Sequence, residues 1–301
     1  MSSTSPIWSA AAEFGGSRGE RRRRFEVATA RMRAPKRCRA PFAPLPPHSK
    51  TLALIALVLS LATWVRAQGN FEVQVYGSET VPARAVMVEL HSNYTVAGQR
   101  QTTDGTFPTH HAWHETVEIT YGFNSWFEMA IYQFTSIQPQ TGFEWVGSHL
   151  RPRVRAPEDW RLPVGLSLST EVGYQRRAFD TETWTWELRP IVDKKWGPFY
   201  AGVNLAFEKS FHGEASSEGF TFSPCAKVSF DVLKQIAVGL EYYTALGQVT
   251  GFDPRQQQQH ILMPAIDWTP TPKWEINFGV GFGLTQGTDD LLIKLILGRQ
   301  F

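Results

Sequence analysis

Apolar and polar residues alternate with a period of two along most of the chain after residue 84. In GLSLSTEVGYQ (165–175) the large apolar side chains fall on one face, and serines and a glutamate fall on the other. The run KWEINFGVGFGLT (273–285) repeats this pattern, with Trp, Ile, Phe and Val opposite Glu, Asn and glycines. A period of two over such lengths indicates β-strands with two unlike faces. The pattern therefore predicts an all-β fold.

The alternating runs number about twelve, and the connections between them alternate in length. We expect strands at roughly 84–96, 112–122, 126–136, 148–157, 163–176, 183–195, 198–210, 219–231, 235–246, 258–268, 273–285 and 290–301. Connections after odd strands are mostly long and polar, such as AGQRQTTDGTFPTHH and QPQTGFEWVG, whereas those after even strands are tight, such as GFNS and TPTP. This asymmetry is typical of an outer-membrane barrel whose short turns face the periplasm. The predicted fold is a closed antiparallel transmembrane β-barrel of about 12 strands.

The apolar face of the predicted strands favours contact with lipid over a soluble core. A closed barrel of this size encloses more space than side chains readily fill, since about eight strands is the filled size. Trp, Phe and Tyr, 13% of the chain, are frequent near the strand ends, as they are in the aromatic girdles of membrane barrels. A soluble all-β protein is the alternative that this pattern leaves open.

The chain has a basic N-terminal part and an acidic remainder. Residues 1–67 hold 12 of the 30 Lys and Arg but only 3 of the 28 Asp and Glu, which leaves 18 basic and 25 acidic residues after them. The apolar run TLALIALVLSLATWV (51–65) follows Lys50 and precedes the small residue Ala67, as in a secretory signal peptide. It is too short for a comfortable transmembrane helix, which needs about 20 residues.

The sequence therefore predicts four parts and an outer-membrane location in a Gram-negative cell. Residues 1–49 are a disordered basic extension, typical of a start codon assigned too early, and residues 50–67 are the signal peptide. Residues 68–83 form a periplasmic N-terminal segment, and residues 84–301 form the transmembrane barrel. Export through the secretory pathway would remove the arginine-rich extension, so no nucleic-acid partner is expected.

A proline recurs on the apolar face of four of the even strands, at Pro152, Pro190, Pro224 and Pro264. Proline lacks the N–H that a ladder needs and is normally excluded from central strands. Because the four prolines are spaced by about one hairpin each, we expect a bulge or bend that the hairpins share.

If the apolar face meets lipid, the opposite face lines the lumen and carries the charges of the strands. The run HLRPRVR (149–155) places three arginines on one face of one strand. Buried charge is costly unless it is paired or hydrated. Two interpretations stay open: the arginines line a wet, narrow pore that selects anionic or aromatic solutes, or they close it in ion-pair ladders with Glu128 and Glu171 as partners. The lumen and selectivity candidates are Arg151, Arg153, Arg155, Glu128, Glu171, Glu187, Arg189, Glu89, His91, His114, Glu118 and His149.

Several histidines fall near these positions. PTHHAWHE (108–115) contains three, and the barrel would bring His91 and His149 near them. Imidazoles together with Glu89 and Glu118 are ligand types that suit Zn or Cu. No compact ligand spacing such as HExxH occurs, and two of the histidines fall in a predicted loop. Hydrogen bonding at the rim and in the lumen is the expected role, with no metal and no cofactor.

Motifs for catalysis are missing from the predicted barrel. After residue 67 neither a GxSxG elbow nor a phosphate-binding loop is present, and the one GxSxG match, GGSRG (15–19), falls in the basic extension. We therefore expect no enzymatic activity, with a hydrolase site at the rim as the weaker alternative. Cysteine is sparse: Cys38 would leave with the exported leader and Cys225 would remain alone, so no internal disulfide is expected.

Four stretches resemble one family of bacterial outer-membrane barrels: THHAWHETVEITYGFNSWFEMAIYQFTS, HLRPRVRAPEDWRLPVGLSLSTEVGYQRR, TWTWELRPIVDKKWG and ILGRQF. The family is the transporter group labelled "MetA-pathway of phenol degradation", and the resemblance covers most of the chain after about residue 84. It implies a role in the uptake of small solutes, including aromatic or hydrophobic compounds. It also implies that Phe301 is the signal read by the barrel-assembly machinery, although Arg299 stands where an aromatic or aliphatic residue is usual.

The predicted function is that of a passive channel or transporter for small solutes. Its partners would be outer-membrane lipid, the barrel-assembly machinery and the solute itself. Such transport needs no cofactor, because a water-filled path suffices. A structural or binding barrel with a lumen plugged by ion pairs is the alternative. In the last predicted strand, Leu291, Ile293, Leu295 and Leu297 alternate toward lipid, while Lys294 points into the lumen.

Overall fold

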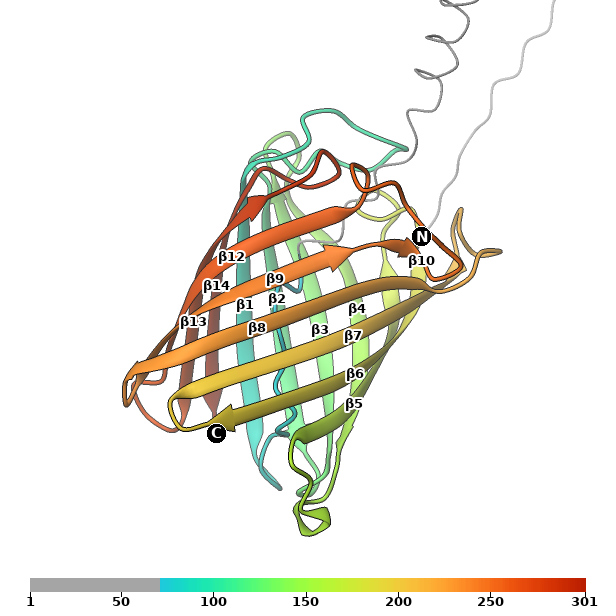
Figure 1. Ribbon diagram of the computed structural model, residues 1–301. Coiled ribbons are helices and arrows are strands. Elements are labelled where there is room, and N and C mark those ends of the chain that lie inside the picture. Colours follow the sequence, from blue (N-terminus) through green and yellow to red (C-terminus); the bar gives the residue numbers. More distant parts are fainter. Residues whose placement is uncertain (1–70) are drawn as a thin grey trace, which may run out of the picture. The chain divides into compact units, whose positions relative to one another are not determined.

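The computed structural model describes residues 71–301, so the predictions for the extension 1–49 and the signal peptide 50–67 lie outside the described residues. Within 71–301 no helix is long and apolar enough to cross a membrane. The fold is a barrel of long antiparallel strands (Figure 1). These strands are β1 (Val86–Ala97), β2 (Trp113–Gly122), β3 (Phe127–Gln138), β4 (Gly142–Arg155), β5 (Gly165–Gln175), β6 (Trp184–Trp196), β7 (Phe199–His212), β8 (Thr221–Leu233), β9 (Ile236–Ala245), β12 (Gln259–Trp268), β13 (Trp274–Gly283) and β14 (Leu291–Gln300).

Three short elements complete the described chain. The strands β10 (Gly247–Gln248) and β11 (Gly251–Phe252), of two residues each, form a small hairpin in the loop after β9. A single 3-10 turn, η1 (Glu158–Trp160), lies between β4 and β5. The barrel wall itself is therefore made by the twelve long strands, as the alternation predicts.

The barrel is closed by pairing between its first and last strands. β1 pairs with β14 along its length, β8 pairs directly with β9, and every other long strand pairs with its neighbours in sequence. The backbone of Phe301 extends this seam: its N–H donates to the Val86 carbonyl at 2.8 Å, and its carbonyl accepts from the Val86 N–H at 3.3 Å. Closure pairs the backbone groups of the wall, which a membrane-spanning structure requires.

The outward positions of the strands are apolar and exposed. Ile131, Val228 and Ile266 are 53%, 56% and 47% exposed. Tryptophans gather near the strand ends, and the exposed ones include Trp113, Trp126, Trp145, Trp184, Trp196 and Trp268. An apolar band flanked by aromatic girdles around a closed barrel is the lipid-facing surface of an outer-membrane barrel. The protein is thus an outer-membrane barrel, and the soluble all-β alternative is wrong.

The connections follow the predicted asymmetry, with one correction. β6 and β7 are joined by two residues at the turn end, whereas residues 98–112 and 246–258 form long connections at the loop end. The loop predicted over 137–147 is instead a three-residue turn, because β4 begins at Gly142 and not near residue 148. Gly142 has φ of 78°, a conformation that glycine adopts without steric cost. A tight hairpin therefore joins β3 and β4.

The recurring prolines interrupt ladders without shifting them. At Pro152 the pairing of β4 with β5 is broken, yet it resumes in the same register. The same gap without a shift occurs at Pro190 between β6 and β7 and at Pro264 between β12 and β13. A bulge is therefore absent at these three prolines, because a bulge would change the register. The fourth, Pro224, is paired with Leu205 in the ladder between β7 and β8.

The chain before β1 lies inside the barrel, where Figure 1 shows its trace within the ring of strands. We call residues 71–83 the lumen segment. The carbonyl of Phe71 accepts hydrogen bonds from side chains of β1 and β2 at 3.3 and 2.9 Å. Further along, Tyr76 is bonded through its backbone to Asn204 of β7, and the N–H of Val81 donates to β3. The sequence predicted a periplasmic segment over 68–83, and its described residues occupy the lumen.

Apolar side chains pack around the lumen segment and form the core of the molecule. Phe71 packs in a cluster with Ala130, Tyr132, Phe134 and Val146. Val73 and Val75 pack in a second cluster with Tyr243, Ile261, Met263 and Leu292. Fully burying one such side chain contributes about 1.5–3 kcal/mol. The lumen at this height is therefore a packed interior.

Candidate functional site

Inward-facing charged residues of neighbouring strands meet in the middle of the lumen. The ladders place Glu89 opposite Glu118 and Glu128 opposite Arg153. All four side chains are buried. Charges at this depth must be paired, since an isolated buried charge is strongly unfavourable.

Two of the three arginines of the HLRPRVR run pair with lumen carboxylates. Arg151 forms an ion pair with Glu118 and donates to Glu128 at 3.1 Å. The Nε of Arg153 donates to the same oxygen of Glu128 at 2.7 Å, so Glu128 bridges the two guanidinium groups. Arg155 pairs with a glutamate of η1 at 3.3 Å, at the turn end, and does not join the cluster.

Glu171, expected as a partner of the arginines, pairs with His149 instead. His149 lies opposite Gly173 in the ladder between β4 and β5. A Cβ at Gly173 would stand 2.0 Å from the His149 ring, so glycine leaves the room in which the imidazole lies. Among the described ion pairs, none joins Glu171 to Arg151, Arg153 or Arg155.

Glu187 and Arg189 lie two residues apart on β6 and pair with each other. Arg189 Nε is 2.6 Å from Glu187 Oε1. Arg189 also stands 4.0 Å from Glu72 of the lumen segment. This pair thus extends the ion-pair network from the wall to the segment.

Three guanidinium groups surround the ring of Tyr76, which belongs to the lumen segment. The central carbons of Arg151, Arg153 and Arg189 lie 5.2, 5.8 and 5.0 Å from its centroid. At such distances a cation is attracted by the face of an aromatic ring. The Tyr76 hydroxyl is 3.2 Å from that of Tyr132 on β3. A phenol side chain therefore occupies the point at which the cations converge.

Arg153 also holds the backbone of the lumen segment. It donates to the carbonyl of Gly77 at 3.1 Å and to that of Glu79 at 2.7 Å. Two strands further along the wall, Asp193 of β6 accepts from the N–H of Ser78 at 3.1 Å. The segment is thus bound to the wall by side-chain hydrogen bonds and not by a strand ladder.

A second ion-pair cluster lies on the other side of the lumen. Lys294 pairs with Glu241, and Lys227 lies 3.2 Å from Glu241 and 2.7 Å from Asp267. The hydroxyl of Tyr243 donates to Glu241 at 2.6 Å. The alternation of the last strand predicts that Lys294 faces the lumen, and the structure confirms it. The alternation does not predict that Glu241 is its ion-pair partner.

Open space lies at both ends of the lumen. A cavity of about 840 Å³ at the turn end is lined by the lumen segment, by Arg153 and Glu89, and by the turn after β4. A smaller cavity of about 190 Å³ lies under the loops, beside Phe107 and Phe179. Between these two cavities the lumen segment and its ion pairs narrow the passage, and a further cavity of about 330 Å³ lies beside the segment, next to Glu241 and Lys294.

The histidines named from the sequence take separate positions. His114 packs edge-on against the first aromatic ring of the lumen segment at 4.3 Å. His110 and His111 contact each other in the loop before β2, with ring centroids 3.9 Å apart and the ring planes tilted by 39°. Desolvation, with the nearby charge of Arg100, lowers the pKa of His110. His91 alone stands beside two carboxylates within ligand distance.

The lumen segment is the main element that the sequence analysis missed. Its first residues, FEVQVYG (71–77), carry a short alternation in which Phe71, Val73 and Val75 are buried. That alternation was the available signal. It was ambiguous because the run is short and ends at a glycine before the first wall strand begins.

The solved structures that are similar to this protein include outer-membrane channels and porins, at low sequence identity. No family model matches the sequence, so the resemblance to the phenol-degradation transporter group is not confirmed. The search of curated proteins found no match to this sequence either. Among solved structures, the COG4313 outer membrane channel from Pseudomonas putida F1 aligns with a TM-score of 0.49 at 11% identity, over 76% of this chain and all of that one. The KdgM porin aligns with a TM-score of 0.45 at 7% identity, over 71% of this chain and 98% of that one. Omp33 of Acinetobacter baumannii aligns with a TM-score of 0.40 at 14% identity, over 75% of this chain and all of that one. These values assign neither a solute nor a residue role.

Proposed function

We propose that this protein is a passive outer-membrane channel for small solutes whose lumen is closed by its own lumen segment. One observation carries the proposal: the material that fills the middle of the barrel, residues 71–83, is not part of the wall. Packing and side-chain hydrogen bonds hold it, so it can leave without breaking a strand pair. A barrel of twelve strands encloses a passage once such a filling is gone.

The residues that hold Tyr76 indicate the class of solute. Its phenol ring lies among Arg151, Arg153 and Arg189, and its hydroxyl meets that of Tyr132. When the segment leaves, a small hydroxyaromatic molecule can occupy the same place with the same contacts. The sequence resemblance to the phenol-degradation transporter group agrees with this chemistry. We therefore propose small phenolic solutes as the cargo.

A disulfide that locks the lumen segment to the wall tests the closure. Cys225 of β8 packs against the apolar cluster that contains Val75, and its Sγ lies 3.9 Å from the carbonyl of Gln74. The substitution Val75→Cys therefore adds one thiol near the native one. We expect the oxidised variant to show no current steps in planar bilayers, and a reductant to restore the wild-type conductance. Val75→Ser, which has no second thiol, is the matched control.

Each result of this experiment decides the proposal. If the wild-type barrel passes no current, the channel function is refuted and a structural barrel closed by ion pairs is the better description. If the oxidised lock conducts as well as the reduced one, the lumen segment is not the closing element. Thiol counting reports whether the bond has formed. Should it not form, the pair Ser78→Cys and Asp193→Cys replaces it, since the Ser78 N–H already donates to Asp193.

Solute entry into liposomes tests the cargo separately. We expect phenol to enter vesicles that contain the barrel faster than cyclohexanol, which has a similar size and hydroxyl but no aromatic face for the arginines. Equal entry rates for the two alcohols would contradict the proposed preference while leaving the channel function intact.

A further inference from the structure

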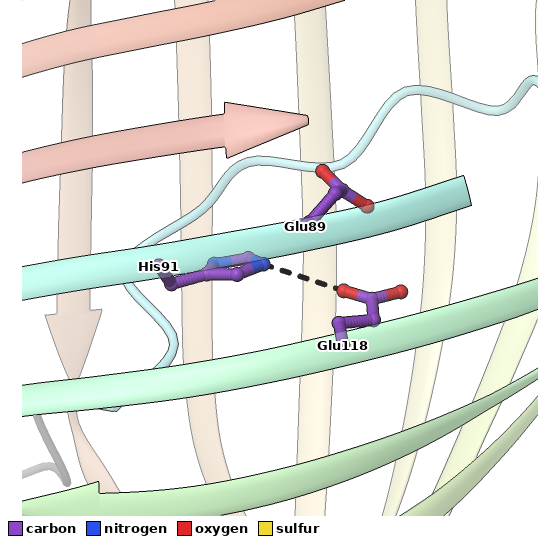
Figure 2. A group of neighbouring side chains, drawn as sticks. All are labelled: Glu89, His91 and Glu118. Carbon is purple, nitrogen blue, oxygen red and sulfur yellow. Dashed lines mark ion pairs between the residues drawn. The ribbon is translucent and has the colours of Figure 1, made fainter. Parts of the chain in front are cut away.

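We propose that Glu89, His91 and Glu118 form a binding site for a divalent transition-metal cation of the Zn²⁺ type in the lumen wall (Figure 2). One ligand atom of each residue lies within 4.8 Å of the others, and all three side chains are buried. Among residues 71–301, no other group of three or more His, Cys, Asp and Glu residues has this spacing. The proposal is independent of the channel function.

The negative charges of Glu89 on β1 and Glu118 on β2 favour a cation between them. Glu89 on β1 lies directly opposite Glu118 on β2, and like charges in such a cross-strand pair are destabilising. Arg151 forms its ion pair with Glu118 and none with Glu89. Glu89 makes no hydrogen bond or ion pair with any described residue. A metal cation between the two carboxylates would stabilise the pair.

The geometry of His91 and Glu118 suits a shared metal. The Nε2 atom of His91 is 3.4 Å from Oε2 of Glu118, and neither atom has a hydrogen-bond partner among the described residues. A hydrogen bond between them would be about 2.9 Å long. Ligands about 2.0–2.1 Å from a tetrahedral Zn²⁺ stand roughly 3.3 Å apart. Figure 2 shows the imidazole and the carboxylate turned toward each other, with Glu89 beside them.

Neighbouring groups orient the ligands and leave the necessary atoms free. Thr120 donates to Oε1 of Glu118 at 2.7 Å, and Arg151 donates to the same oxygen, so Oε2 remains available. Partners of this kind fix the direction of a metal ligand. Gly298 lies opposite Glu89 on β14, where a Cβ would approach Glu89 Cγ to 3.2 Å. The missing side chain leaves Glu89 room to close the remaining separation.

Access and ligand type define the class of metal. Glu89 lines the cavity of about 840 Å³ at the turn end, so a hydrated cation can reach the site and retain water at the open position. An imidazole with two carboxylates suits Zn²⁺, Cu²⁺, Fe²⁺ or Ni²⁺. Ca²⁺ is excluded in favour of these ions because it takes six to eight oxygen ligands.

Metal titration of the refolded barrel tests the site. After treatment with a chelator and dialysis, Zn²⁺ is titrated by calorimetry and Co²⁺ by its visible absorption. We expect one ion per barrel for the wild type and, for Glu89→Gln and His91→Gln, an affinity at least about tenfold lower. Glu275→Gln is the matched control: Glu275 lines the same cavity and lies opposite Gly298 from β13, outside the cluster. Because Glu275 is not a ligand but its charge acts on Glu89, the affinity of this variant should stay much closer to that of the wild type than the affinity of Glu89→Gln does.

The outcomes separate a lumen site from other sources of binding. Heat-modifiable gel migration shows that each variant is folded, and Glu89→Gln breaks no described contact. Replacing His110 and His111 of the loop by glutamine should leave the binding unchanged. The proposal is overturned if the wild type binds no Zn²⁺, if Glu89→Gln binds it as tightly as the wild type, or if binding disappears with the two loop histidines.

Discussion

Replacing Asn204 by alanine should release the lumen segment from the wall. Asn204 is fully buried on β7, and its side chain makes two hydrogen bonds with the backbone of Tyr76. Its Oδ1 accepts from the Tyr76 N–H at 2.8 Å, and its Nδ2 donates to the Tyr76 carbonyl at 2.8 Å. Alanine removes both bonds at once and leaves the wall ladder of β7 intact. Within the wall it removes only the weak contact between Cys225 Sγ and Asn204 Oδ1 at 3.8 Å, so the change acts mainly on the docked segment.

The magnitude follows from the two bonds. Each buried hydrogen bond contributes about 1 kcal/mol net, and backbone groups left unpaired away from water cost about 1–3 kcal/mol more. The docked state should therefore lose about 3–5 kcal/mol relative to the released state. Since about 1.4 kcal/mol corresponds to a factor of ten, the ratio of docked to released segment should fall roughly 140- to 3,700-fold.

Single-channel recording and hydrogen exchange measure this shift. Asn204→Ala should raise the open probability and speed the exchange of the Tyr76 amide. The control is Asn277→Ala, because the Asn277 amide donates only to carboxylates of the wall, at 2.7 Å to Asp267 and 3.2 Å to Glu241. If Asn204→Ala changes neither quantity more than Asn277→Ala does, Asn204 is not what holds the segment.

Three further changes test the membrane, the core and the seam. Val228→Arg on the outer face of β8 should lower the free energy of unfolding from vesicles by about 2–4 kcal/mol, whereas Val228→Phe should change it little; equal effects would contradict lipid contact. Lys294→Met should lower the free energy of unfolding by about 3 kcal/mol, the low end for a broken buried ion pair, because Lys227 still lies 3.2 Å from Glu241 and offsets its charge. An unchanged midpoint of urea unfolding would show that the ion pair is dispensable. Phe301→Ala keeps the backbone bonds of the seam, so if the side chain is an assembly signal, the folded barrel in the outer membrane, seen by heat-modifiable migration, should decrease while refolding in detergent is unaffected.

The strands were predictable because lipid contact demands an apolar residue at every second position. That requirement acts on each residue locally, so twelve runs could be found without knowing how they pair. The start of β4 was missed because QPQTG reads as a loop, although Phe143 and Trp145 continue the outward alternation. A hairpin with a glycine at positive φ and a polar loop have the same composition here.

The lumen was not predictable in the same way, because its contacts depend on register. Arg151 reaches Glu118 across an intervening strand, which no local pattern reveals. The sequence offers Glu171 as a partner for the arginines, but Glu171 pairs with His149, because Gly173 leaves space for the His149 ring. The lumen segment is held in place by wall side chains that form hydrogen bonds with its backbone. Such hydrogen bonds require no periodic pattern of residues, so the sequence does not reveal them.

The seam between β1 and β14 bears on how this barrel can form. Met87 pairs with Gln300, so closure joins residues more than two hundred positions apart in the sequence. The lumen segment directly precedes β1 and packs against strands of both halves, including β12 and β14. It must therefore be in place when the ring shuts, or thread in afterwards through one end. Closure of the strands around the lumen segment, which precedes them in the chain, is the simpler of these two routes.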